Sequence, residues 1–366
     1  MPYCRLLNLR YTKMSRFFSS RYDSLSPYVP GEQPKDRKYV KLNTNESPFR
    51  ISAHAREKAG EALETLQLYP DPDCTLLREK IAAYYNVNIQ NVFAANGSDE
   101  ALNFAFMAFC GPEVPAVFAD ITYGFYPVFA DINALPYKII ELDEEFRIRT
   151  DEFARSKGTL VIANPNAPTG ILLETDVIED IVKTSRDRVV IVDEAYIDFG
   201  GESAVSLTKK YDNLLVVQTF SKSRSMAGAR LGFAIGNEEL INDLNTIKYS
   251  TNPYNVNRVS AALGAGVMED DEYTRANCRV IMENRSYLTN ELEKLGFYVI
   301  PSMANFVFAR CGGISGKELY LSLKQKGVLV RYFDKERLFD YVRITIGTRQ
   351  QLDCLLDKIK EIQCKA

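Results

Sequence analysis

The chain has 366 residues, a formal net charge of −3 and 46% hydrophobic residues. At about 150 residues per domain, this length predicts two domains, or one large domain with a smaller one. The small net charge gives no general attraction to nucleic acid or to an anionic membrane. No apolar run approaches the roughly 20 residues of a membrane-spanning helix. We therefore expect neither a nucleic acid nor a membrane as a partner.

The cysteines and the histidine exclude further classes of protein. The 7 cysteines are odd in number and form no CxxC pair, which favours a reduced, cytoplasmic protein over a disulfide scaffold. The single histidine, His54, excludes zinc sites built on several histidines, and we expect no metal. His54 lies in the amphipathic pattern "SAHAREKAGEAL", so we interpret it as a helix-surface residue rather than a catalytic one.

The chain begins with a basic stretch, residues 1–22, which has five basic residues and no acid. An organellar transit peptide is one interpretation. We favour a short disordered arm, because no cleavage site is evident. Residues 23–50 contain the proline-rich "SLSPYVPGEQP" and are expected to form an extended arm that joins the small domain.

Short apolar runs alternate with amphipathic helical patterns in residues 51–270. The strand-like runs are residues 91–96, 114–120, 137–142, 158–165, 188–196, 213–220 and 231–237. Helical patterns cover residues 74–86, 99–109, 175–186 and 238–248. This alternation predicts a large α/β domain, with a mostly parallel sheet and helices on both of its faces. The runs lack clean polar alternation, as buried parallel strands do.

The pattern changes at about residue 271. A long helical stretch is followed by "FYVIPSMANFVFAR", then by "GKELYLSLKQKGVLVRYF" and "YVRITIG", and by a helix to the end. Residues 271–366 therefore predict a smaller C-terminal α+β domain.

Polar or aromatic residues follow the ends of five predicted strands, where parallel α/β sheets bind ligands. They are "NGSDE" at 96–100, Tyr123, "NAPTG" at 166–170, Asp193 with Tyr196, and Ser221-Lys222 with Arg230. Each signal alone has a simpler explanation, respectively a helix N-cap, a core aromatic, a loop, a structural ion pair and a surface lysine.

Two of these residues point to a specific chemistry. Asp193 ends an apolar strand, where an unpaired charge is costly, so we expect it to have a cationic partner. Lys222 follows another apolar strand, and desolvation or nearby cations would prepare its amine for imine chemistry. A lysine for an imine, a carboxylate for a pyridinium nitrogen, an aromatic cover and a phosphate site together suit pyridoxal 5′-phosphate.

The motifs in this order resemble the fold-type I aminotransferases, a pyridoxal-phosphate-dependent family. The match covers the chain from about Leu25 to the end, on the motifs "YPDP" (69–72), "NGSDE" (96–100), "TY" (122–123), "NPNAPTG" (164–170), "DEAY" (193–196), "SK" (221–222) and Arg230. The resemblance implies an enzyme with a large cofactor-binding domain and a small domain.

The resemblance also implies roles for the cofactor residues. Lys222 attaches the cofactor through an imine, Asp193 keeps its pyridine nitrogen protonated, and Tyr196 bonds to its ring oxygen. Tyr123 stacks on the ring. The phosphate is held by Ser98, Asp99, Ser221 and Arg230, and by Tyr69 from the partner subunit of a homodimer.

One position departs from the family pattern. The family has asparagine before the proline of its "NPTG" turn, where this chain has Ala167. We assign the ring-oxygen contact of that asparagine to Asn166, one residue earlier.

"LSPYVPG" (25–31), "LNTNESPF" (42–49) and "VRITIGT" (342–348) are similar to the histidinol-phosphate aminotransferase group. This group implies glutamate and the phosphorylated ketone imidazole-acetol phosphate as substrates. The expected substrate-binding residues are Tyr28, Asn45, Arg331 and Arg343. A threonine-phosphate decarboxylase and an aromatic amino-acid aminotransferase on the same fold remain alternatives, as does a catalytically silent ligand-binding relative.

Overall fold

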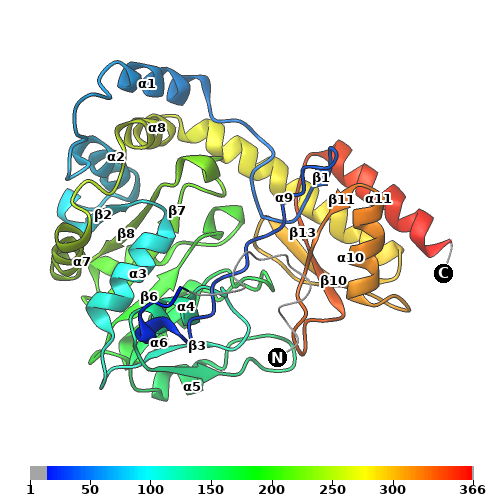
Figure 1. Ribbon diagram of the computed structural model, residues 1–366, viewed down its shortest axis with the longest axis horizontal. Coiled ribbons are helices and arrows are strands. Elements are labelled where there is room, and N and C mark those ends of the chain that lie inside the picture. Colours follow the sequence, from blue (N-terminus) through cyan, green and yellow to red (C-terminus); the bar gives the residue numbers. More distant parts are fainter. Residues whose placement is uncertain (1–14, 365–366) are drawn as a thin grey trace.

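The computed structural model describes residues 15–364 (Figure 1). Most of the predicted basic stretch, residues 1–14, lies outside the described residues, and residues 20–22 form a short 3₁₀ helix. Within the described part, no helix is both long and apolar enough to cross a membrane.

The larger of the two main sheets has the strand order β2-β8-β7-β6-β5-β3-β4. Its strands are β2 (Val92–Ala95), β3 (Ala116–Ala119), β4 (Tyr137–Ile140), β5 (Thr159–Ala163), β6 (Val190–Asp193), β7 (Leu214–Thr219) and β8 (Gly232–Gly236). Each lies inside a run predicted from the sequence. Only β8 runs antiparallel to its neighbours, so the predicted mostly parallel sheet is confirmed.

Helices cover both faces of this sheet, and each face has its own apolar core. One face packs on α3 (Ser98–Phe109), α4 (Tyr126–Ile132) and α7 (Glu238–Thr251). The other packs on α2 (Thr75–Tyr85), α5 (Thr150–Arg155), α6 (Thr175–Thr184) and α8 (Arg258–Glu269), and α1 (Ala53–Leu63) packs on α8. Six of the seven strands are buried along their whole length, which explains their unbroken apolar runs.

The second unit begins with the long helix α9 (Asp271–Lys294), which follows α8 almost without a break (Figure 1). Its antiparallel sheet has the order β12-β13-β10-β9, formed by β9 (Phe297–Ile300), β10 (Phe306–Cys311), β12 (Arg331–Tyr332) and β13 (Tyr341–Thr345). One face packs on α9, α10 (Gly316–Gln325) and α11 (Arg349–Gln363) in a separate core. Phe308 and Tyr341 belong instead to the core of the large unit. The predicted fold class, a large α/β domain with a smaller α+β domain, is confirmed.

The segment from 23 to 50 is mostly extended and lies against the small unit. Its strand β1 (Val40–Lys41) pairs in parallel with β11 (Val328–Leu329). The guanidinium of Arg37 donates to the carbonyl oxygens of Lys324 and Gln325. The segment thereby reaches the region between the two sheets.

Candidate active site

A cavity of about 620 Å³, open to solvent, lies at the carboxyl ends of β5, β6 and β7. We call it the strand-end cavity. Its lining includes most of the cofactor residues predicted from the sequence: Ser98, Asp99, Tyr123, Asp193, Tyr196, Ser221, Lys222 and Arg230. The topology of the sheet brings these residues together from the ends of four strands, β2, β3, β6 and β7, and the segments after them, as expected for strand ends.

Asp193, the last residue of β6, presents a buried carboxylate to the cavity. Burial raises the pKa of this carboxyl to about 6. Within residues 15–364 no lysine or arginine forms an ion pair with Asp193, so the cationic partner expected for it is not one of these side chains. Its oxygens accept from the hydroxyl of Tyr126 at 2.8 Å and from the amide of Ala195 at 3.2 Å. The site therefore holds an anion that lacks a cation.

Lys222 lies in the loop after β7, and its side chain is half-buried. The amine donates to the carbonyl oxygen of Thr44 at 3.4 Å and lies 5.7 Å from the ring centre of Tyr196. No carboxylate of the described residues pairs with it, so the amine is free to bond to a ligand carbonyl.

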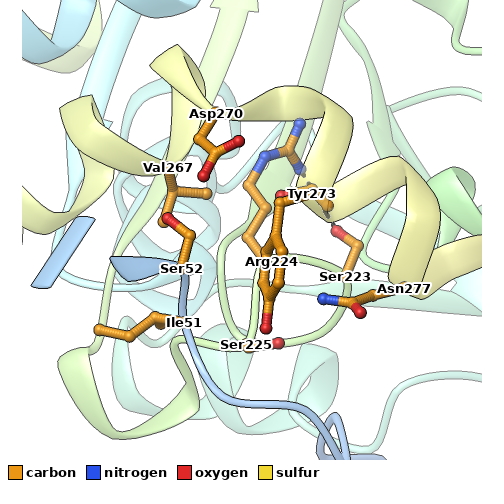
Figure 2. A pocket seen from close by; sticks show the side chains of 10 residues that line it. Ile51, Ser52, Ser223, Arg224, Ser225, Val267, Asp270, Tyr273 and Asn277 are labelled. Atoms are coloured by element: carbon orange, nitrogen blue, oxygen red, sulfur yellow. Dashed lines mark hydrogen bonds between the residues drawn. The ribbon is translucent and has the colours of Figure 1, made fainter. Parts of the chain in front are cut away.

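The loop that carries Lys222 is anchored by Arg224, whose side chain is only 2% exposed. Its Nη1 donates to Asp198 at 2.7 Å, and the Ser223 hydroxyl donates to the same carboxylate. Asp198 lies in the 3₁₀ turn Ile197–Phe199 that follows Tyr196. Figure 2 shows Arg224 among the side chains of a small pocket, between Ile51-Ser52 and the start of α9. This buried ion pair joins the Lys222 loop to the Tyr196 loop.

The N-terminus of α3 forms one end of the cavity. Its N-cap is Gly97, at φ +83°, and no side chain caps its free N–H groups. A Cβ on Gly97 would lie 2.8 Å from the Arg230 guanidinium, and one on Gly232 would lie 2.4 Å from the Ser98 nitrogen. Both glycines therefore allow the close packing that places Arg230 beside the helix start. Such an end favours an anion such as phosphate.

Arg230 and Ser221 belong to this same end. The guanidinium donates to Ser221 Oγ at 3.3 Å and to Asp99 Oδ2 at 3.1 Å. Asp99 Oδ1 accepts from the hydroxyl of Tyr123 at 2.8 Å. Burial is the largest of several causes that raise the pKa of Tyr123, so the phenol stays neutral.

Sequence reasoning did not assign a role to Tyr126, which donates to Asp193. Tyr126 is fully buried, and its ring meets that of Tyr123 edge to face at 5.6 Å. The sequence shows that Tyr126 follows Tyr123 by three residues. It does not show that the Tyr126 side chain points toward Asp193.

The Asn166 prediction is opposed by the geometry. The Asn166 amide is buried and donates to the Ile121 carbonyl at 2.9 Å and to Thr169 Oγ1 at 3.2 Å. Asn166 is not among the residues that line the cavity, whereas Ala167 is. The peptide bonds before Pro165 and Pro168 are both cis. The turn thus presents a methyl group to the cavity, and the Asn166 side chain holds the turn onto the sheet.

Asn45 also differs from its predicted role as a substrate residue. It is 1% exposed, and its side-chain nitrogen donates to the Tyr196 hydroxyl at 3.0 Å. The side chain is therefore enclosed behind Tyr196 and has no open path to a substrate.

Arg331 and Arg343 lie directly opposite each other on β12 and β13. Like charges in this position destabilise a sheet. Their hydrogen bonds go to backbone oxygens, from Arg331 to Val29 and Pro30 and from Arg343 to Asn43. The buried Nε of Arg343 has no partner within the described residues. Burial lowers the pKa of Arg343. The pair is thus arranged for an anion that the protein itself does not supply.

Tyr28 lies beside this pair and the cavity. Its ring centre is 4.8 Å from that of Phe125 and 6.2 Å from that of Tyr123. Burial raises the pKa of Tyr28, and the nearby Arg331 and Arg343 oppose this shift. Tyr28 therefore covers the opening between Tyr123 and the arginines.

Tyr69 is 77% exposed and lies outside this cavity. Its ring stacks on Tyr254 at 4.5 Å, and its carbonyl oxygen accepts from Arg258. Three neighbouring leucines are more than half exposed: Leu63, Leu66 and Leu68. The position suits a residue that acts outside its own subunit.

The residues present fit pyridoxal phosphate. The buried Asp193 without a cation matches a protonated pyridine nitrogen, the free Lys222 amine matches an aldehyde, and the uncapped start of α3 matches a phosphate. No group of three or more metal-ligating residues is found within residues 15–364.

Comparison with known proteins agrees with this geometry. The family model for aminotransferase class I and II matches residues 37–359. A histidinol-phosphate aminotransferase of Clostridium botulinum is 48% identical over 350 residues, which cover 95% of this chain and 99% of that protein. One from Brachyspira hyodysenteriae is 47% identical over 351 residues, with the same two coverages.

A solved structure shows the same fold. The histidinol-phosphate aminotransferase from Sinorhizobium meliloti, in complex with pyridoxal-5′-phosphate, has a TM-score of 0.86 at 19% identity, over 96% of this chain and 99% of that one. The family model and the close relatives match nearly the whole chain, and these matches show to which family it belongs. The chain belongs to the class I and II aminotransferases, and within them to the histidinol-phosphate aminotransferases.

Proposed function

We propose that this chain uses pyridoxal phosphate to transfer the amino group of glutamate to imidazole-acetol phosphate. The products are 2-oxoglutarate and histidinol phosphate, and the reaction belongs to histidine biosynthesis. The observation that carries this proposal is the buried Asp193 without a cation in the same cavity as the free Lys222 amine.

The residues that would hold the cofactor are those of the strand-end cavity. Ser98, Asp99, Ser221 and Arg230 would hold its phosphate, with Tyr69 of a second subunit reaching the same group. Tyr123 would cover the ring, and Tyr196 would donate to the ring oxygen. When bound, the cofactor supplies an electron sink for the amino carbon of the substrate.

Two side chains would carry out the proton chemistry. Lys222 Nζ would take the proton from the amino-bearing carbon of the substrate as a general base, and would then donate it as a general acid to the cofactor carbon that receives the amino nitrogen. Asp193 would remain ionised beside the bound pyridinium nitrogen, because that cation offsets the burial of its charge. The hydroxyl of Tyr126 would keep the carboxylate oriented.

Arg331 and Arg343 would bind the anionic group that both substrates carry. Arginine suits this role because its planar fork pairs with a carboxylate or with a phosphate. The partnerless Nε of Arg343 supports the assignment. One arginine pair would then accept the glutamate carboxylate and the phosphate of the ketone in turn, with Tyr28 closing over the substrate.

We also propose the surrounding organisation of the chain. Residues 51–270 would form the cofactor-binding domain, residues 271–366 the small domain, and residues 23–50 the arm that joins them. The exposed apolar residues around Tyr69 support a homodimer. The cysteines of the described part are free thiols, which supports a cytoplasmic location.

A substrate comparison tests the function. We expect kcat/KM with glutamate to be at least about a hundredfold higher for imidazole-acetol phosphate than for phenylpyruvate, because Arg331 and Arg343 would be left unpaired by an acceptor that lacks the phosphate. Lys222→Ala is the control and should abolish turnover. Preference for phenylpyruvate, or release of carbon dioxide from threonine phosphate, would instead identify one of the two related enzymes.

A further inference from the structure

Asn45 connects the arm, the small unit and the large unit of the molecule. Its backbone nitrogen donates to Thr345 Oγ1 at 2.9 Å, and its carbonyl oxygen accepts from Asn305 Nδ2 at 3.0 Å. Thr345 Oγ1 also lies 3.0 Å from Asn45 Oδ1, and Asn45 Nδ2 lies 3.0 Å from the Tyr196 hydroxyl. Asn45 adopts φ +57°, a conformation that asparagine tolerates better than most residues.

These contacts determine where each proton lies. A backbone N–H can only donate, so Thr345 Oγ1 accepts from Asn45 and uses its own proton elsewhere. Asn45 Oδ1 is the acceptor that faces Thr345 Oγ1, and Oγ1 donates its proton to it. The other end of the amide is then the NH₂ group, which faces Tyr196 and donates to it.

The hydroxyl of Tyr196 consequently accepts a hydrogen bond from the protein, and its own proton is left over. Within the described residues this oxygen has no second hydrogen-bond partner, and Tyr196 lines the strand-end cavity. The neighbouring Ala167 has no donor, and Asn166 is turned away. The Tyr196 hydroxyl is thus the side-chain donor available to a ligand on the side of the cavity formed by Tyr196 and Ala167.

We propose that Asn45 is a positioning residue, which directs the Tyr196 proton toward the ring oxygen of the bound cofactor through a hydrogen-bond chain that starts at Thr345. Asn45 touches neither cofactor nor substrate. Because Thr345 lies on β13 and Asn45 on the arm, this chain links the placement of the small unit to the cofactor ring.

The inference rests on the proposed contact between Tyr196 and the cofactor. A pH titration of the absorbance of the bound cofactor distinguishes a failure of the positioning role from a failure of this contact. A donor to the ring oxygen stabilises the negative charge there. The oxygen then stabilises the proton on the neighbouring nitrogen less, and this nitrogen, which joins Lys222 to the cofactor, has a lower pKa. Loss of the donor should therefore raise the pH at which the absorbance changes.

We expect Tyr196→Phe to raise this midpoint by about one pH unit, the size of a hydrogen bond to a charged group. Asn45→Gly should raise it by about half a unit, since the hydroxyl remains but loses its alignment. Glycine suits the positive φ, so this variant removes the side chain without backbone strain. In the Tyr196→Phe background, Asn45→Gly should cause no further rise.

Thr345→Val and Thr345→Ser form a matched pair that does not depend on the folding of Asn45→Gly. The valine variant removes the hydroxyl and should raise the midpoint, whereas the serine variant keeps it and should not. An unchanged midpoint in Asn45→Gly or in Thr345→Val, or equal shifts with and without the Tyr196 hydroxyl, overturns the positioning role. An unchanged midpoint in Tyr196→Phe overturns the proposed cofactor contact instead.

Discussion

At the scale of single residues, Asp193 makes the cofactor-free protein less stable at neutral pH. Burial raises the pKa of its carboxyl from 3.8 to about 6. The folded state therefore binds a proton more tightly than the unfolded state does, and stability falls as the pH rises through this window. A shift of about two pH units corresponds to about 3 kcal/mol once both states are ionised.

Asp193→Asn should remove this penalty, because the amide has the same shape and no charge. We expect the unfolding free energy of the cofactor-free protein to rise by up to about 3 kcal/mol at pH 8 and by about half as much at pH 5. Urea unfolding of the wild type and of Asp193→Asn, each without cofactor, measures this free energy. Asp180→Asn, at a carboxylate exposed on α6, is the matched control and should change stability little. A gain from Asp193→Asn that is the same at both pH values would refute the burial argument.

Arg343 is a cation whose buried Nε has no hydrogen-bond partner within residues 15–364. Arg343→Ala should lower kcat/KM by about a hundredfold or more for glutamate and for the phosphorylated ketone alike, since charge-assisted pairs with both would be lost. Steady-state kinetics with each substrate measures this. Arg310→Ala, at an exposed position on the same sheet, is the control. A loss confined to one substrate would show that the two anions use different sites.

The residue scale is also where prediction from the sequence was weakest. The strand-end motifs identified the eight cavity residues, but not the direction of side chains in the turns. Asn166 and Asn45 carry amides that suit a ligand, yet each bonds to the protein because the backbone turns it inward. Asp193 was expected to have a cationic partner, but the sequence did not reveal that the phenol of Tyr126 would donate to its carboxylate.

At the scale of elements, the sequence predicted the large sheet well. Parallel strands buried on both faces are continuous apolar runs, and each of the seven strands lies within its predicted range. The two-residue strands β1, β11 and β12 are too short to leave a pattern. The pairing of β1 with β11 also joins segments about 290 residues apart, such as Val40 with Val328, which no local signal reveals.

The Lys222 loop depends on the buried ion pair between Arg224 and Asp198. Loss of one member of a fully buried pair costs about 3–5 kcal/mol; Asp198 is 23% exposed and keeps the Ser223 hydroxyl, so we take about 2–3 kcal/mol for the loss of Arg224. We therefore expect Arg224→Met to lower the unfolding free energy by that amount and to weaken cofactor retention, since the loops of Lys222 and Tyr196 lose their connection. Urea unfolding and equilibrium dialysis of pyridoxal phosphate measure the two effects.

Two further variants test whether the pair itself is responsible. Addition of Asp198→Asn to Arg224→Met should restore part of the stability, because the unpaired carboxylate is removed. Arg186→Ala breaks a solvent-exposed pair with Asp212 and should cost less than about 1 kcal/mol. A loss for Arg224→Met as small as that for Arg186→Ala would contradict the anchoring role.

At the scale of the whole molecule, the predicted site residues come from parts far apart in the chain. The arm contributes Tyr28, the large unit Lys222 and Asp193, and the small unit Arg343. Tyr69 lies outside the strand-end cavity, on a surface with exposed leucines. If a second subunit covers this surface, each complete site needs Lys222 from one chain and Tyr69 from the other.

A heterodimer of two defective chains tests this arrangement. Co-expression of Lys222→Ala and Tyr69→Ala chains with different tags allows the mixed dimer to be purified. One of its two sites then has both Lys222 and a partner Tyr69, so about half of the sites should bind cofactor with wild-type affinity and turn over normally. Neither homodimer has such a site. A mixed dimer of Lys222→Ala and Asp193→Asn chains is the control, because each of its sites has one defect from its own chain. Equal activity in the two mixed dimers would mean that Tyr69 acts within its own subunit.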